Sequence, residues 1–265
     1  MLRYLNGISK KDSIITDEGK KVEIYELNIN HSEEVLNEWA KHFRRQYCDD
    51  ASLSKLVEGT GMSKQEWLLT YKFPSDKIKP GPSTRAGDFG EILISDYIQY
   101  ICSYYVPTRM KYSNKINPNT SQQGSDVIGL KMQKEESIND ELYVIEVKTK
   151  ASKSKETGNR LQDAINDSMK DTERQSITLS AMRQRLIELN KEDESKIVQR
   201  FQNWADRPFK IKYGATAIYT TEMLDLEKIR QIKMPVEKDS INLFILYVDD
   251  LMNFIHELYR RASIC

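Results

Sequence analysis

The sequence contains few of the residues that build disulfide frameworks or zinc sites. Only three cysteines occur in 265 residues, at positions 48, 102 and 265, and none belongs to a CxxC pair. This pattern excludes a disulfide scaffold and a zinc finger and is typical of a reducing compartment. The three histidines are spread widely along the chain, so a histidine-based metal site is not indicated either.

A long apolar run and a net charge are also missing. No stretch of eighteen consecutive apolar residues is present, and the opening M-L-R-Y-L-N does not have the apolar run of a signal peptide. We therefore expect a soluble, cytoplasmic protein with no membrane partner. The 40 basic and 40 acidic residues balance, so net charge argues neither for nor against a nucleic-acid partner, and only local clusters are informative.

Three prolines and a glycine between residues 74 and 82 form the clearest break in the chain. We place a domain boundary near residue 80 on this basis. Residues 1–80 are then an N-terminal, mostly helical extension, which we consider a candidate partner-binding segment. It is expected to hold one strand at 22–29 and helices that begin after the capping residues Ser32 and Ser63.

Residues 81–265 alternate between the hydrophobic periods of helices and of strands. The elements expected in chain order are a helix at 87–104, strands at 106–112, 126–132 and 141–150, helices around 161–169, 179–189 and 197–204, strands at 214–221 and 241–248, and a closing helix after Asp249 or Asp250. This order predicts an α/β fold with a mixed central sheet and helices on both faces. The strands at 126–132 and 141–150 should form an antiparallel hairpin, and the strongly apolar strand at 241–248 should be central.

A charged pair interrupts the strand pattern E-L-Y-V-I-E-V-K-T-K at residues 141–150. Because alternate residues of a strand face the same side, Glu146, Lys148 and Lys150 share one face. Charges on a core strand are costly to desolvate and need a partner or a function. The structural interpretation is that Glu146 and Lys148 form an ion pair within the strand. The short E-x-K pattern, taken alone, favours this interpretation over a functional one.

Three acidic residues are predicted to converge at one end of the sheet. If the strand at 126–132 pairs with the strand at 141–150, Asp126 lies near Glu146, and Glu91 on the preceding helix can reach the same end. Such a cluster of oxygen ligands suits a hard cation such as Mg²⁺, with Mn²⁺ as the alternative. The metal would polarise a scissile phosphate, and Lys148 would orient or help to deprotonate an attacking water.

The functional interpretation of this cluster is favoured over the structural one for three of the four residues. An ion pair accounts for Glu146 and Lys148 but leaves Asp126 unexplained. Glu91 has an equally good structural explanation, because a glutamate in the first turn of a helix is stabilised by the helix dipole.

Basic residues surround the predicted cluster in sequence. Lys150, Lys153 and Lys155 follow the E-x-K motif without an intervening acid, and Arg85 precedes the helix that carries Glu91. These residues are candidates for contacts with a DNA backbone. A solvated lysine run, and for Arg85 an ion pair with Asp88, explain them equally well.

The acidic set with its lysine resembles the motif of the PD-(D/E)xK nuclease superfamily. G-S-D, a spacer, and then E-V-K place the family's aspartate at Asp126 and its E-x-K at Glu146 and Lys148, with Glu91 as the additional helical glutamate. A serine stands where the family has proline, which carries no chemistry. The resemblance implies a restriction-endonuclease-like fold, Mg²⁺-dependent cleavage of DNA, and Gln162 as an accessory residue on the helix after the motif.

A narrower resemblance concerns the HamA nuclease subunit of Hachiman anti-phage defence systems. It depends on the N-terminal extension followed by G-D-F-G-E, G-S-D and Y-V-I-E-V-K-T in a chain of this size. It implies an effector nuclease that acts with a helicase partner, HamB. Two alternatives stay open at this point: a catalytically idle scaffold of the same fold that serves as a DNA-binding module, and an RNA-directed nuclease.

Overall fold

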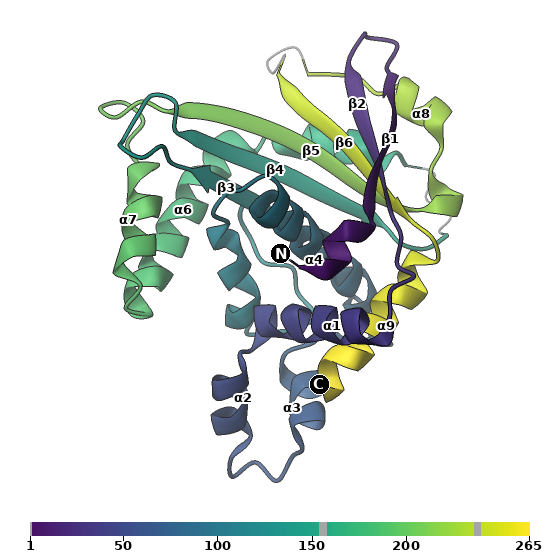
Figure 1. The fold of residues 1–265 in the computed structure, drawn as a ribbon, viewed down its shortest axis with the longest axis vertical. Coiled ribbons are helices and arrows are strands. Elements are labelled where there is room, and N and C mark those ends of the chain that lie inside the picture. The colour runs from purple at the N-terminus through teal and green to yellow at the C-terminus, as the bar shows by residue number, and fades with distance from the viewer. Residues whose placement is uncertain (1, 154–157, 236–239) are drawn as a thin grey trace.

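A six-stranded mixed sheet with helices on both faces organises the computed structural model, which describes residues 2–153, 158–235 and 240–265 (Figure 1). The strands are β1 (Ile8–Ile15), β2 (Lys21–Leu27), β3 (Val127–Lys131), β4 (Glu141–Lys150), β5 (Lys210–Thr220) and β6 (Ile241–Val248). Their spatial order is β1-β2-β6-β5-β4-β3. The predicted α/β class and mixed sheet are confirmed.

The sheet is parallel in its centre and antiparallel at both edges. β2, β6, β5 and β4 run parallel to one another, whereas β1 is antiparallel to β2 and β3 is antiparallel to β4. The hairpin of β3 and β4 and the inner position of β6 are therefore as the sequence predicts. Parallel neighbours need crossover connections, and helices supply them between β4 and β5 and between β5 and β6.

Nine α-helices and four shorter turns of helix lie in the described ranges. The α-helices are α1 (Glu33–Tyr47), α2 (Asp50–Val57), α3 (Lys64–Tyr71), α4 (Gly81–Asp96), α5 (Arg160–Ser168), α6 (Asp171–Glu188), α7 (Glu192–Arg200), α8 (Leu226–Arg230) and α9 (Leu251–Ile264). The shorter turns are η1 (Arg3–Gly7), η2 (Tyr97–Ile101), η3 (Pro107–Asn114) and η4 (Thr221–Met223). Both predicted caps are present: Ser32 accepts a hydrogen bond from Val35 N, and Ser63 forms a reciprocal capping box with Glu66.

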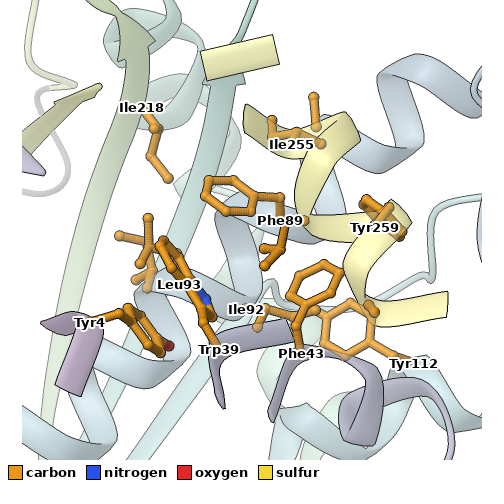
Figure 2. Packing of buried hydrophobic residues seen from close by; sticks show 14 of the residues in the cluster. Tyr4, Trp39, Phe43, Phe89, Ile92, Leu93, Tyr112, Ile218, Ile255 and Tyr259 are labelled. Atoms are coloured by element: carbon orange, nitrogen blue, oxygen red, sulfur yellow. The ribbon is translucent and has the colours of Figure 1, made fainter. Parts of the chain in front are cut away.

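One face of the sheet is covered by α4, which is itself covered by α1 and α9 (Figures 1 and 2). Phe89 of α4 lies 6.4 Å from Phe43 of α1, measured between ring centroids, and Phe43 lies 4.9 Å from Tyr259 of α9. Tyr4 stacks on Trp39 at 3.9 Å. These aromatic side chains form one buried cluster to which segments before and after residue 80 both contribute.

The boundary expected near residue 80 therefore falls between segments that share a sheet and a core. β2, from the predicted extension, pairs with β6. Arg261 of α9 forms an ion pair with Glu33 of α1 at 2.6 Å.

The opposite face of the sheet is covered by α5, α6 and α7. Leu161 and Ile165 of α5 belong to the buried cluster that contains Ala217 of β5, and Leu179 and Leu186 of α6 belong to the cluster that contains Val144 of β4. In Figure 1, α6 and α7 lie beside the β3 edge of the sheet and α8 lies beside the β1 edge. Within the described ranges, none of the helices combines the length and apolar character needed to cross a bilayer.

The strand predicted at 106–112 is wrong. This segment is the 3₁₀ helix η3, which begins at Pro107, and the only pairing next to it is a single bridge between Tyr105 and Leu130. Proline has no backbone N–H to give to a ladder and its fixed φ suits the first turn of a helix, so the alternating pattern was misleading here.

β1 was not predicted at all. Its apolar residues lie at its ends, and its middle carries Lys10 and Lys11, which form ion pairs with Glu23 and Glu26 of β2. Lysines of this kind are typical of edge strands.

Candidate active site

The hairpin of β3 and β4 brings Asp126 next to Glu146. Val127 pairs with Ile145 in the antiparallel register, so the residue before β3 lies beside the residue after Ile145. Asp126 Oδ2 accepts a hydrogen bond from Val147 N at 2.8 Å, which fixes the carboxylate against β4. Two acidic groups that are twenty residues apart in the chain are thus held together by sheet pairing.

Glu91 reaches the same place because α4 packs unusually close to β4. At Gly90, a Cβ would overlap the Thr149 hydroxyl and lie 3.2 Å from Ile218 Cδ1. Only glycine therefore fits at this contact, and its neighbour Glu91 is carried to the rim of the sheet. Tyr112 OH donates to Glu91 Oε2 at 3.0 Å.

A buried lysine lies between two of the acidic residues. Lys111 Nζ is 2.5 Å from Glu91 Oε2 and donates to the main-chain oxygen of Asp126 at 2.7 Å. Lys111 belongs to η3, so the segment that sequence periodicity misassigned contributes directly to the cluster.

Two cations contact Glu146, whose side chain is only 2% exposed. Lys148 Nζ lies 2.7 Å from Glu146 Oε1 and 2.7 Å from Asp167 Oδ2. On the other side, Arg174 Nη2 lies 3.3 Å from Glu146 Oε2. The side chains of Glu146 and Lys148 point to the same face of β4, as the strand period requires.

The three acids of the motif, together with Lys148, Asp167 and Arg174, line one cleft of about 560 Å³. Its walls come from the start of α4, the loop before β3, the middle of β4 and the facing ends of α5 and α6. The lining residues are Ser83, Gly87, Glu91, Ser121, Gln122, Gln123, Gly124, Asp126, Glu146, Val147, Lys148, Thr149, Asp167, Lys170, Arg174 and Ile177. The four residues of the predicted motif therefore share a single cleft.

The charges in the cleft alter one another's protonation. Burial raises the pKa of Asp126 well above its ordinary value, and the nearby carboxylates of Glu91 and Glu146 raise it further. Burial opposes the charge of Lys148, but Glu146 and Asp167 outweigh it, so the pKa of Lys148 is raised. Burial also opposes the charge of Asp167, but hydrogen bonds from Lys148 and Lys170 outweigh it and lower the pKa of Asp167 to about 2.

The carboxylates of the acidic cluster are the kind of ligand that a hard cation requires. In this structure Glu91 is paired with Lys111, and Glu146 with Lys148 and Arg174. Among the described residues, no group of three or more His, Cys, Asp or Glu side chains is arranged to hold a metal ion. Carboxylate oxygens are nonetheless the ligands that Mg²⁺ and Mn²⁺ prefer. Burial chiefly, and then the neighbouring Glu91 and Glu146, disfavour the charged form of Asp126, and a bound divalent cation would favour it.

Gln162 does not line the cleft. Its amide nitrogen donates to Asn166 Oδ1 and to Lys233 O, and its amide oxygen accepts from Lys233 N. Asp167 is the residue of α5 that does contact the motif. The two residues are five positions apart and point in directions that differ by roughly 140° around a helix.

The predicted DNA-backbone residues also lie outside the cleft lining. Arg85 is buried, donates to Pro74 O at 2.6 Å and lies over the Tyr259 ring. Lys150 is buried, and Lys153 is exposed and forms an ion pair with Glu222 at 2.7 Å. Lys155 lies outside the described residues. The cations that do line the cleft are Lys148, Lys170 and Arg174.

Sequence reasoning missed Lys111, Tyr112, Asp167 and Arg174. Asp167 lies on the helix predicted around 161–169, but the pattern did not show which face of that helix meets the motif. Arg174 falls between the helices predicted around 161–169 and 179–189, whereas α6 begins at Asp171. Lys111 and Tyr112 gave no usable signal, because their segment was assigned to a strand.

The fold and the cleft define an α/β protein in which carboxylates and a lysine meet at the rim of a mixed sheet. The chain belongs to the HamA family, whose model matches residues 3–262, nearly the full length. Membership in this family implies a subunit of a Hachiman defence system. No curated protein matches the chain.

Proposed function

We propose that this chain is a metal-dependent deoxyribonuclease that hydrolyses phosphodiester bonds as the effector subunit of a Hachiman complex, together with a helicase partner. The observation that carries the proposal is the convergence of Asp126, Glu146, Glu91 and Lys148 in one cleft. Family membership supports the defence role. The activity, the metal and the helicase are our proposal.

Each residue of the motif has a distinct role in this proposal. Asp126 and Glu146 would hold a divalent cation, with Glu91 completing the set from α4. A bound Mg²⁺ would supply the Lewis acidity that polarises a phosphodiester. Because the pKa of Lys148 is raised, its amine stays protonated near neutral pH. Lys148 would therefore orient a water or donate to a phosphate oxygen rather than remove a proton.

The cleft also provides positive charge for a nucleic-acid backbone. Lys170 is 67% exposed, and Arg174 lies behind it at the start of α6. Both line the cleft, so a phosphate chain entering it would meet them before it reached Glu146. The balanced net charge of the chain supports delivery of the DNA by a partner rather than by a general electrostatic attraction.

The test is a cleavage assay with the chain purified together with the product of its neighbouring gene. Plasmid DNA, Mg²⁺ and ATP are added, and the parent is compared with Glu146→Gln and Lys148→Met. We expect cleavage by the parent and loss of cleavage in both variants. Lys196→Met is the matched control, because Lys196 is exposed on α7 and does not line the cleft. Equal cleavage by the parent and the two cleft variants would remove the motif from the mechanism.

A catalytically idle binding module is the second candidate, and one observation favours it. Lys148 and Arg174 already contact Glu146, and Lys111 already contacts Glu91, so the acids are balanced without a metal. This candidate predicts DNA binding that does not depend on Mg²⁺ and no cleavage under any condition. Parallel assays with RNA of the same sequence separate a deoxyribonuclease from an RNA-directed nuclease.

A further inference from the structure

Lys111 is a buried cation at the centre of the acidic cluster to which no role has been given. Its side chain is 9% exposed, and it does not belong to the lining of the cleft. It therefore differs from Lys148 and Lys170, whose amines can meet a substrate from the open side. Lys111 contacts the acids from behind.

Its two contacts join residues on separate elements. The amine lies 2.5 Å from Glu91 Oε2 on α4 and donates at 2.7 Å to the main-chain oxygen of Asp126, at the start of β3. One ammonium group thus connects the helix and the strand that supply two of the three carboxylates.

The backbone that carries Lys111 is itself anchored on both of these elements. Thr108 Oγ1 accepts a hydrogen bond from Ile128 N of β3 at 3.2 Å, and Tyr112 OH donates to Glu91 Oε2. A short 3₁₀ helix that is fixed on either side of the lysine leaves the amine little freedom to move away. Its positive charge therefore stays close to the acids whatever else binds there.

We propose that Lys111 is a positioning residue that holds Glu91 and Asp126 together without a metal and that sets a low affinity for divalent cations by opposing their charge. This inference rests on the proposed function, because it takes these two acids as metal ligands. Like charges a few ångströms apart repel strongly where water is largely excluded. Removing the charge of Lys111 should therefore raise the affinity of the site for metal. If Lys111 only ordered the site, its removal would lower that affinity instead.

The experiment is calorimetric titration of the full-length chain with Mn²⁺ near neutral pH, without DNA. We expect Lys111→Met to bind Mn²⁺ more tightly than the parent by roughly tenfold or more. Lys111→Gln, which keeps a donor for Asp126 O but removes the charge, should shift the affinity in the same direction. The matched control is Lys72→Met, because Lys72 also donates to a main-chain oxygen of η3, that of Ser113, at 2.8 Å and does not line the cleft. Its Mn²⁺ affinity should equal that of the parent.

The outcomes separate the two proposals. Unchanged or weaker Mn²⁺ binding by both Lys111 variants, with binding by the parent intact, would overturn the role of Lys111 and leave the metal site standing. No binding by the parent or by either variant at millimolar Mn²⁺ would overturn the metal site and this inference together. If the variants fold only when Mn²⁺ is present, the result supports the proposal that Lys111 and a divalent cation are alternative partners of these acids. If they do not fold even then, Lys111 serves folding alone and the proposal fails.

Discussion

Two buried charge clusters flank the β3–β4 hairpin, one at the start of β4 and one further along it. At the start, Asp140 and Arg200 are 0% and 2% exposed and lie 2.9 Å apart. Further along, Glu146 is 2% exposed and Lys148 is 27% exposed. Both clusters place a carboxylate beside a cation on the same hairpin, and the second borders the cleft of about 560 Å³.

The difference lies in access to the cleft and in the number of carboxylates that lie together. Asp140 accepts hydrogen bonds from Gln133 N, Ser137 N and Arg200, and Arg200 also donates to three main-chain oxygens. That cluster is closed and holds loops in place. In the cleft, by contrast, three carboxylates lie together, and burial, reinforced by Glu91 and Glu146, raises the pKa of Asp126. A buried charge is therefore an indication of a site where it also faces a cleft.

The sharpest test of this contrast is the loss of a cation from each cluster. In the cleft, Lys148→Met should reduce DNA cleavage by the complex by roughly 10²–10⁴-fold, because a positioned donor is lost. The free energy of unfolding should change little, since Arg174 still contacts Glu146. Cleavage rates and urea denaturation measure the two effects. A folded variant with parental activity would contradict the assignment.

In the closed cluster, Arg200→Met should reduce the free energy of unfolding by about 3–5 kcal/mol, because it leaves Asp140 buried and unpaired. Any activity that remains at a temperature where the variant is folded should resemble that of the parent. Denaturation monitored by circular dichroism measures the loss. If Arg200→Met lost activity but kept its stability, the Asp140–Arg200 cluster would have a functional role rather than a structural one.

The contact that brings Glu91 to the cleft can be tested with two glycines of α4. Gly90→Ala should reduce stability by about 1–3 kcal/mol, because the added methyl group meets the Thr149 hydroxyl on a stiff, β-branched side chain. Gly87→Ala is the matched control, because a Cβ there meets nothing within 4 Å. It should stabilise the helix by roughly 0.5–1 kcal/mol. Thermal melting of both variants gives the comparison, and equal melting temperatures would mean that α4 has room to move.

The smallest expected effect is a pH dependence that comes from Asp126. The pKa of this carboxyl is higher in the folded than in the unfolded chain, so its protonated form favours folding at low pH. That contribution is lost as pH rises through the folded-state pKa. Asp126→Asn should therefore gain stability relative to the parent as pH rises from about 4, the ordinary aspartate value, towards neutrality. Denaturation in the presence of a chelator follows the difference, and a constant difference across this range would show that folding does not raise the pKa of Asp126.

Much of the fold followed from local patterns. Ser32 and Ser63 cap their helices as expected, since capping depends on residues within one turn. The β3–β4 hairpin followed from two strand patterns joined by a short polar turn. The shared face of Glu146 and Lys148 followed from the strand period alone.

Other parts depended on partners that lie far away in the chain. β1 is a strand because β2 pairs with it, and its own pattern is weak. The alternation at 106–112 indicated a strand, yet pairing with the edge strand β3 is limited to the single bridge between Tyr105 and Leu130, and Pro107 starts a 3₁₀ helix instead. The side of α5 that faces the cleft was set by packing on β5, which points Asp167 to Lys148 and Gln162 to the backbone of Lys233.

By itself the sequence determined which residue types stand at which strand and helix positions, and so it specified Asp126, Glu146 and Lys148 as a set. Only the tertiary structure decided what surrounds them: the close approach of α4 at Gly90, the cations from α6 and η3, and the cleft itself. The physical reason is the separation along the chain over which each effect acts. Backbone periodicity and capping act over a few residues, whereas the electrostatic environment of a carboxylate depends on every charge that folding brings within several ångströms of it.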